Sequence, residues 1–505
     1  MGDNRHAGGE PEASHARRRP GKDGARWGSA VFSGALGGTL TVMADTRTER
    51  DSLGEVAVPA EALYGAQTQR AVRNFAISGM RAHPQLVRAT ALIKLASARA
   101  NHALGKLDER RARAIEQVAR EIADGGLRDE FVVDVFQAGA GTSHNMNANE
   151  VIANRANELL GGRRGVYDPI HPNDHVNMSQ STNDTVPAAI RVSVLLMAPD
   201  LLRSLDGLAE AFEVKGREFD GILKSARTHL QDAVPIRLGQ EFSAYGWTIR
   251  RDARRIHEAI AYLREINLGG SAAGTGMNTH SRYARTVARE LSEAAGLDLL
   301  PAENLIAVMQ SMSDIASVSA TLRTLALDLL QITNDLRLLS SGPRTGLAEI
   351  RLPALQPGSS IMPGKVNPVI PEMTAMVCYQ VIGNDMTVAM ATQAGQLELN
   401  VMMPVIAHNV LQSLEILTNA CRALDESCVR GITADEERAR HYFESTVGLA
   451  TVLNPVIGYE AAAKVAQESA RTGETIVEVV RRLGLLSDDQ MRELFDPAGL
   501  TEPRG

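Results

Sequence analysis

The residues with the clearest chemical potential lie in one short segment, 358–368, which reads GSSIMPGKVNP. Two adjacent hydroxyls are followed by a cation and an amide, and this set of polar groups suits a small dicarboxylate. Lys365 and Asn367 would hold one carboxylate, and the hydroxyls of Ser359 and Ser360 would hold the other. Glycine and proline prevent a helix here, so we predict a loop that can close over a ligand rather than a plain surface turn.

A nucleotide site is not predicted from the same segment. A P-loop has four residues between its glycines and a Ser or Thr after its lysine. Here five residues separate Gly358 from Gly364, and Val366 follows Lys365. No GxGxxG pattern occurs at the other glycine pairs, so we expect no dinucleotide cofactor either.

Three further segments combine hydroxyls, amides and small residues at the ends of helical stretches: 139–145, 171–184 and 228–232. Thr142 and the run Ser181-Thr182-Asn183 can be interpreted as helix caps, and His229 as a structural histidine. Free N–H groups and the helix dipole make a helix N-terminus a natural anion site. Capping and carboxylate binding are therefore compatible interpretations.

No metal site is predicted. His171 and His175 have the i, i+4 spacing of a metal pair, but Pro172 disfavours the helix and no glutamate completes a metalloprotease pattern. The cysteines number three and lack metal-ligand spacing. We expect them to be reduced and buried as small apolar groups, which fits a cytoplasmic protein.

Composition limits the type of core and the kinds of partner that the chain can have. The chain has 505 residues, 44% of them apolar, 22% charged and only 4% aromatic. A core built from Leu, Ile, Val, Ala and Met suits packed helices. The net charge of −7 and the absence of a basic stripe argue against a nucleic-acid partner. No segment approaches 18 uninterrupted apolar residues, so no membrane partner is predicted.

The expected organisation is mainly helical. Apolar residues from Ile315 to Leu339 recur at alternating steps of three and four, which predicts a long helix that ends before Gly342-Pro343. Similar patterns predict helices near 190–212, 249–263, 373–392 and 397–425. We therefore predict a disordered extension (1–47), a mixed helical domain (48–181), a central long-helix bundle (182–436) and a small helical domain (437–505). Seams this narrow favour an oligomer.

Taken together, the four polar segments resemble the aspartase/fumarase superfamily, whose signature is similar to 358–367. The likeness runs from about Tyr64-Gly65-Ala66-Gln67-Thr68 to the C-terminus. It implies a mainly α, three-domain lyase whose central helices assemble into a twenty-helix core in a homotetramer. Each active site would take residues from three subunits and need neither a redox nor a nucleotide cofactor.

Within the superfamily, the aspartase branch is the closer match. Segments 334–344, 417–421 and 431–434 are similar to that branch, and Ala140 stands where fumarases typically carry a serine. Thr228, His229 and Glu372 do not separate the two branches. The resemblance implies the reaction L-aspartate ⇌ fumarate + ammonia. A fumarase that hydrates fumarate to malate, a lyase for a larger N-substituted aspartate such as argininosuccinate, and a retired enzyme serving as a structural or binding protein are the alternatives.

The resemblance also implies roles for individual residues. Ser359 would be the base that removes the Cβ proton, and four hydroxyls would surround the carboxylate that becomes an enediolate: Thr142, Ser181, Thr182 and Ser360. Lys365 and Asn367 would hold the second carboxylate. The amino group would be held by Asn183, Thr228 and His229, with Glu372 orienting His229. His144 is an unusual neighbour that could adjust the pocket.

Overall fold

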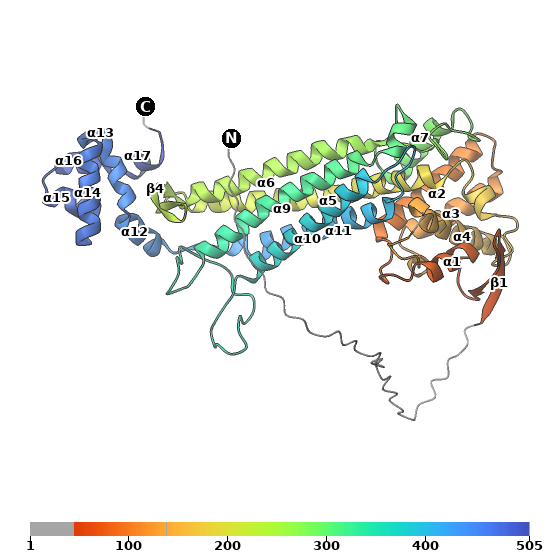
Figure 1. Ribbon diagram of the computed structural model, residues 1–505, viewed down its shortest axis with the longest axis horizontal. Helices are drawn as coiled ribbons and strands as arrows, with labels where there is room; N and C mark the ends of the chain where they lie inside the picture. Colours follow the sequence, from red (N-terminus) through yellow and green to blue (C-terminus); the bar gives the residue numbers. More distant parts are fainter. Residues whose placement is uncertain (1–44, 138, 504–505) are drawn as a thin grey trace, which may run out of the picture. The chain divides into compact units, whose positions relative to one another are not determined.

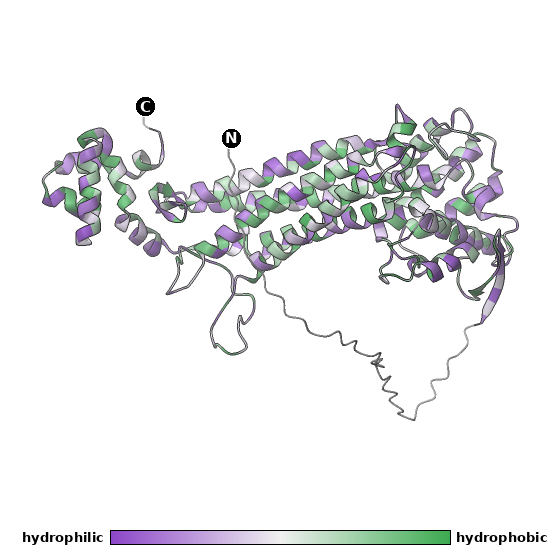
Figure 2. Ribbon diagram, viewed as in Figure 1, coloured by the Kyte–Doolittle hydropathy of each residue, from purple (hydrophilic) through white to green (hydrophobic). Residues whose placement is uncertain are grey.

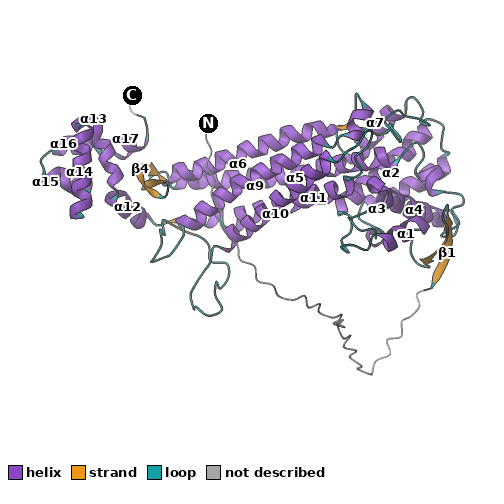
Figure 3. Ribbon diagram, in the orientation of Figure 1, coloured by secondary structure: helices purple, strands orange, loops and turns teal. Residues whose placement is uncertain are grey.

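The computed structural model describes residues 45–137 and 139–503 (Figures 1 and 3). The predicted extension lies outside the described residues as far as Ala44. The first strand, β1 (Thr46–Asp51), begins two residues before the predicted domain boundary, because it pairs in antiparallel fashion with β2 (Gly54–Pro59). The described chain is mainly helical, which confirms the predicted fold class.

Five long helices lie side by side in a central bundle (Figure 1). They are α5 (Thr182–Glu218), α6 (Leu238–Ala261), α9 (Ser313–Leu339), α10 (Val369–Gln393) and α11 (Met403–Ser427). The apolar seam from Ile315 to Leu339 is buried, as its spacing predicts, and the same core holds the buried faces of the other four helices. α5 contains both Pro187 and Pro199 but remains one helix from Thr182 to Glu218. It spans the length of the bundle.

A second core lies in the region before α5. The helices there are α1 (Ala66–Asn74), α2 (Pro84–Ala103), α3 (Glu109–Ala123) and α4 (Thr142–Leu159). Short turns connect them at Arg128–Glu130, Gly139–Gly141 and, as a π-helix, Pro172–Val176. This region places the N-terminus of α4 against the N-terminus of α5.

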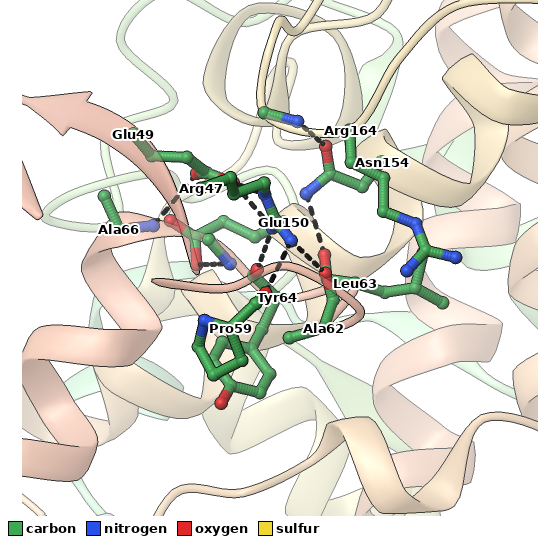
Figure 4. A network of polar contacts seen from close by, with 12 residues as sticks. Arg47, Glu49, Pro59, Ala62, Leu63, Tyr64, Ala66, Glu150, Asn154 and Arg164 are labelled. Atoms are coloured by element: carbon green, nitrogen blue, oxygen red, sulfur yellow. Dashed lines mark hydrogen bonds and ion pairs between the residues drawn. The ribbon is translucent and has the colours of Figure 1, made fainter. Parts of the chain in front are cut away.

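A buried polar network ties β1 to α1 and α4 (Figure 4). Arg47 donates to the carbonyl oxygens of Pro59, Ala60, Ala62 and Tyr64. The Glu150 carboxylate on α4 accepts from the backbone N–H groups of Gly65, Gln67 and Thr68, at 2.9, 2.9 and 3.1 Å. These bonds satisfy the first free donors of α1, so a side chain from one helix caps another.

The remaining elements are short. Strands form two-stranded sheets: β3 (Leu223–Thr228) with β4 (Gln231–Arg237), β5 (Glu265–Ile266) with β6 (Leu300–Pro301), and β7 (Ile350–Arg351) with β8 (Thr433–Ala434). α7 (Tyr283–Ala295) packs on α2, and α8 is Leu305–Gln310. The C-terminal segment has its own small core and contains α12 (Glu436–Ser445), α13 (Asn454–Ile457), α14 (Tyr459–Thr472), α15 (Ile476–Arg482), α16 (Asp488–Leu494) and α17 (Pro497–Thr501).

Apolar and polar residues alternate along the bundle helices, as the hydropathy colouring shows (Figure 2). By length and composition, α5 and α9 could each cross a bilayer, but both bury their seams in the bundle core. α10 also carries apolar side chains on its exposed side, among them Met376, Tyr379, Met386 and Met390. The three cysteines are free and buried, as predicted: Cys378, Cys421 and Cys428.

Candidate active site

The segment around Ser359 is a loop, as predicted, and it connects β7 to α10 without regular structure. Ser359 Oγ accepts hydrogen bonds from the backbone N–H groups of Ile361 at 3.2 Å and Met362 at 2.9 Å. Two donors aimed at one oxygen stabilise negative charge on it. The loop thus supplies the local donors that a serine base requires.

The base of this loop is closed by its own polar groups. Gly358 N donates to the Lys365 carbonyl oxygen, and Asn367 Nδ2 donates to the Gly358 carbonyl oxygen, both at 2.8 Å. A Cβ on Gly358 would lie 2.6 Å from the Lys365 carbonyl oxygen. Glycine is therefore required here because the backbone of Lys365 lies so close, and not because Gly358 has a positive φ. Gly364 does have a positive φ of 79°, and Lys365 is exposed without an ion pair among the described residues.

Thr228 and His229 lie at the tip of the β3–β4 hairpin. His229 and Leu230 occupy the two turn positions with φ of 55° and 61°. Such a turn favours Asn-Gly, and each non-glycine residue there stores strain. Because strain of this kind clusters at functional sites, it is an independent structural reason to consider His229, which is exposed.

A buried charge cluster joins this hairpin to the segment that leads into the loop. The fully buried Glu349 pairs with Lys224 and with Arg227, both at 3.0 Å. Lys224 also pairs with Glu241 of α6 at 2.9 Å. The hairpin, the loop and the N-terminus of α10 therefore belong to one end of the bundle.

We call this group of predicted site residues the loop half-site: Thr228, His229, Ser359, Ser360, Lys365, Asn367 and Glu372. Glu372 lies in the first turn of α10. Among the described residues, no hydrogen bond or ion pair joins Glu372 to His229. The predicted orienting contact is thus not made within a single chain.

The other predicted residues lie at the opposite end of α5, and we call them the hydroxyl half-site: Thr142, Ser181, Thr182 and Asn183. Thr142 begins α4, and Ser181 caps α5 by accepting from Asn183 N at 3.2 Å. Asn145 Nδ2 on α4 donates to Thr182 Oγ1 at 3.3 Å, which links the two helices. Two helix N-termini therefore converge where an anion would be favoured.

The two half-sites of one chain cannot meet. α5 has 37 residues, so its ends lie about 55 Å apart at 1.5 Å per residue. Ser359 follows Glu349 by ten residues, which reach at most about 35 Å even when fully extended. A complete site therefore needs at least two chains.

Comparison with known proteins identifies the family. A family model described as lyase matches residues 54–383, and one described as fumarase C C-terminus matches residues 449–502. An aspartate ammonia-lyase from Pseudomonas fluorescens is 50% identical over 468 residues, which cover 92% of this chain and 98% of that protein. The chain belongs to the aspartase/fumarase superfamily.

Other members of the superfamily are similarly close. A class II fumarate hydratase from Neisseria meningitidis is 45% identical over 91% of this chain and 100% of its own length. The crystal structure of a fumarate lyase:delta crystallin from Brucella melitensis bound to cobalt is 51% identical, with a TM-score of 0.88 over 91% of this chain and 100% of that one. The superfamily fold thus covers nearly all described residues.

Behind the hydroxyl half-site lies a buried residue that the sequence-based reasoning missed. Lys94 is fully buried on α2, and burial lowers its pKa to about 7 while the nearby Asp184 carboxylate opposes that shift. Its signal in the sequence is a single lysine within the apolar run 91–96. Like other buried charges, it has a cost that its surroundings must offset.

His144, for which we predicted an effect on the pocket, lies in the first turn of α4. Its ring is buried, and Nε2 lies 3.0 Å from Thr90 Oγ1 on α2. Burial, reinforced by the Lys94 charge, lowers the pKa of His144 to about 4. The ring is therefore neutral near pH 7 and brings no charge to the pocket.

Asp184 supports the start of α5. Its carboxylate accepts from the backbone N–H groups of Ser181, Gly269 and Ser271, at 2.9, 3.1 and 2.9 Å. Burial raises its pKa to about 6, and these bonds limit the rise. Asn183 Nδ2 donates to the Ala272 carbonyl oxygen at 2.8 Å, so the segment 269–272 helps to fix the hydroxyl half-site.

Proposed function

We propose that this protein is an aspartate ammonia-lyase, a carbon–nitrogen lyase that reversibly converts L-aspartate to fumarate and ammonia. The observation that carries the proposal is the 50% identity to the Pseudomonas fluorescens aspartate ammonia-lyase across almost the whole of both chains. Every residue type that the reaction needs is present in the two half-sites. Small dicarboxylates are the corresponding substrate class.

The reaction requires stabilisation of a doubly charged carboxylate. Removing a Cβ proton beside a carboxylate creates an enediolate, which the enzyme must bind more tightly than the ground state. Hydroxyl donors that already point at the oxygens strengthen as charge builds and need no reorganisation. In the proposed mechanism these donors are Thr142, Ser181, Thr182 and Ser360.

Ser359 is the proposed base. Its oxygen accepts two backbone N–H bonds, which favour the ionised form that can take a proton from Cβ. The exposed apolar side chains of Ile361 and Met362 lie at the tip of the loop. Closing this loop over the substrate would exclude water from the reacting carbon.

The remaining predicted residues bind the other parts of the substrate. Lys365 and Asn367 hold the second carboxylate, and Lys365 is well suited because its ammonium has no ion-pair partner among the described residues. Asn183, Thr228 and His229 surround the amino group as it leaves. Glu372 would orient His229 across an interface between copies. The proposed steps draw on no redox or nucleotide cofactor.

A homotetramer with shared sites is the proposed assembly. The separation of the two half-sites requires residues from more than one copy. The exposed apolar side chains of α10, together with Leu327 and Leu338 of α9, offer a surface through which bundles could pack into a larger helical core. We propose a cytoplasmic location, which the three free and buried thiols support.

The second candidate function is that of a class II fumarase, which hydrates fumarate to malate. The 45% identity to the Neisseria meningitidis fumarate hydratase favours it. The same hydroxyls, base and loop would deliver water in place of ammonia. The two functions differ in the group that leaves Cα, so the substrate itself distinguishes them.

One assay tests both functions. Purified protein is given L-aspartate or L-malate, and fumarate is measured by its ultraviolet absorbance. We expect fumarate from L-aspartate at a rate at least about tenfold above that from malate, since a polar pocket discriminates strongly between donor groups. A faster reaction with malate would establish the fumarase instead, and turnover of neither would contradict both.

A further inference from the structure

The buried cation behind the hydroxyl half-site has no role in the mechanism described so far. Lys94 Nζ donates to Asn145 Oδ1 at 2.7 Å, Gln180 Oε1 at 2.9 Å and Asn177 Oδ1 at 3.0 Å. Three amide oxygens thus receive all three donors of one ammonium group. Within the described residues Lys94 has no carboxylate partner in an ion pair, so its direct hydrogen-bond partners are neutral amides, and the buried Asp184 carboxylate acts on it only at longer range.

This arrangement determines which way the Asn145 amide faces. An ammonium can only donate, so the oxygen of Asn145 must point towards Lys94. The two Nδ2 protons then go to Asn177 Oδ1 at 3.2 Å and to Thr182 Oγ1 at 3.3 Å. Thr182 Oγ1 therefore accepts a bond from inside the protein, and its own proton is left for a bond on the other side.

We propose that Lys94 is a positioning residue that acts through Asn145 to fix the Thr182 hydroxyl as a hydrogen-bond donor to the substrate carboxylate. The inference rests on the proposed function and adds a relay behind it: Lys94, Asn145, Thr182, substrate. Hydrogen bonds in such a chain polarise one another in a medium of low dielectric constant. The relay therefore strengthens as negative charge develops on the carboxylate, and its effect belongs in kcat more than in KM.

Two substitutions of the same kind separate this relay from a merely structural role. Asn145→Asp and Gln180→Glu each replace an amide by a carboxylate of similar shape and give Lys94 an anionic partner. Only Asn145→Asp removes the N–H group that Thr182 accepts. The new carboxylate would then accept from Thr182, which turns the hydroxyl proton away from the substrate.

We expect Asn145→Asp to lower kcat about 100-fold, the usual loss for one oxyanion donor, with KM and the thermal midpoint little changed. Gln180→Glu should keep kcat within about threefold, because among the described residues the N–H groups of the native Gln180 side chain bond only to the carbonyl oxygens of Val176 and Met178. Equal losses in the two variants, or an undiminished kcat in Asn145→Asp, would overturn the relay.

A second comparison covers the case in which Asn145→Asp does not fold. Lys94→Met fills a similar volume without a buried charge, an exchange that proteins often tolerate. Under the relay, Lys94→Met and Thr182→Val damage the same interaction, so the double variant should have a kcat within about threefold of the worse single variant. Losses that multiply would contradict the proposal.

The readouts also distinguish this inference from the proposed function. Turnover of L-aspartate or malate by the native protein tests the function, whereas the ratio between variants tests the relay. If the native protein converts neither, the affinity for the nitronate form of 3-nitropropionate, an unreactive mimic of the doubly charged carboxylate, replaces kcat as the readout. Weaker binding of this nitronate in Asn145→Asp than in Gln180→Glu would then support the relay, and equal affinities would overturn it.

Discussion

At the scale of single residues, the surroundings of Ser359, the proposed base, suit a weakly basic group that has to abstract a proton. A serine hydroxyl accepts a proton well only when its oxygen can carry negative charge. The N–H groups of Ile361 and Met362 converge on that oxygen within the loop itself. The support for the base is therefore part of the same short segment and moves with it.

Ser359→Ala should lower the turnover of L-aspartate by at least about 100-fold, since general-base catalysis contributes at least that much. The loop would keep its shape, because Gly358 and Asn367 close its base independently of the hydroxyl. Steady-state kinetics and the mass of the assembly in solution check the prediction. A variant that keeps a tenth of the native activity would remove Ser359 from the role of base.

Because the His144 side chain is buried, we expect the stability of the protein to depend on pH. Its folded pKa of about 4 lies below the ordinary value of 6.5, so the folded chain binds fewer protons than the unfolded chain between these values. Stability is highest above pH 6.5 and falls as the pH drops towards 4. By pH 5 the loss from this one group is about 2 kcal/mol.

His144→Gln should remove this contribution while still offering Thr90 an amide partner. We expect the thermal midpoint of the variant to fall less between pH 7 and pH 5 than that of the native protein. Thermal unfolding at the two pH values measures the difference. The same fall in both proteins would show that His144 is not the group responsible.

At the scale of elements, the start of α1 depends on contacts that come from far along the chain. Gly65 N donates to Glu150, and there is no space for a side chain at this position: a Cβ would lie 2.1 Å from Tyr167 Oη and 2.5 Å from Glu49 Oε2. The polar network therefore requires glycine at position 65.

Gly65→Ala should destabilise the protein by about 2 kcal/mol, the usual cost of overpacking a buried site. Gly221→Ala is the matched control, because a Cβ there meets no atom within 4 Å and the backbone is not in the left-handed region. Chemical denaturation of both variants measures the difference. Similar free energies of unfolding in the two variants would show that the network can accommodate the added methyl group without loss of stability.

The elements were predictable to different degrees. The five bundle helices follow from apolar periodicity, because a narrow seam must be buried against a neighbour. The loop at 358–368 follows from its glycines and prolines. Lys94 and Glu349 were not predictable in the same way, since their partners lie 51 to 125 residues away and no local pattern encodes such pairs. The chain positions of the site residues and the sharing of sites between subunits came from resemblance, but the structure was required to show which residues lie at which end of α5.

At the scale of the whole molecule, the separation of the two predicted half-sites means that a single folded chain cannot hold the whole of the proposed site. The hydroxyl half-site and the loop half-site lie at opposite ends of α5 and are held there by separate buried networks. Activity should therefore depend on assembly. Each active site should also combine residues from different copies, which mixtures of two inactive variants can test.

Thr182→Val disables one half-site and Ser359→Ala the other, so each variant alone should be nearly inactive. Assemblies made from equal amounts of both should recover activity, because some sites combine an intact half from each variant. Random mixing predicts about a quarter of the native sites. Co-expression followed by kinetics on the purified mixture measures the recovery.

Ser359→Ala mixed with Lys365→Ala is the control for this experiment. Both substitutions fall in the same loop, so no combination of copies restores an intact loop half-site. We expect this mixture to stay as inactive as its components. Recovery in the control, or none in the test mixture, would contradict sites shared between chains.

The length of α5 has a consequence for how such a protein can change over generations. One residue inserted in the middle of this helix would rotate one end against the other by about 100° and shift it by about 1.5 Å. Every copy would inherit the same displacement, so no partner could compensate for it. Among homologues, insertions and deletions should therefore accumulate in the connections between helices, while α5 keeps a fixed number of turns.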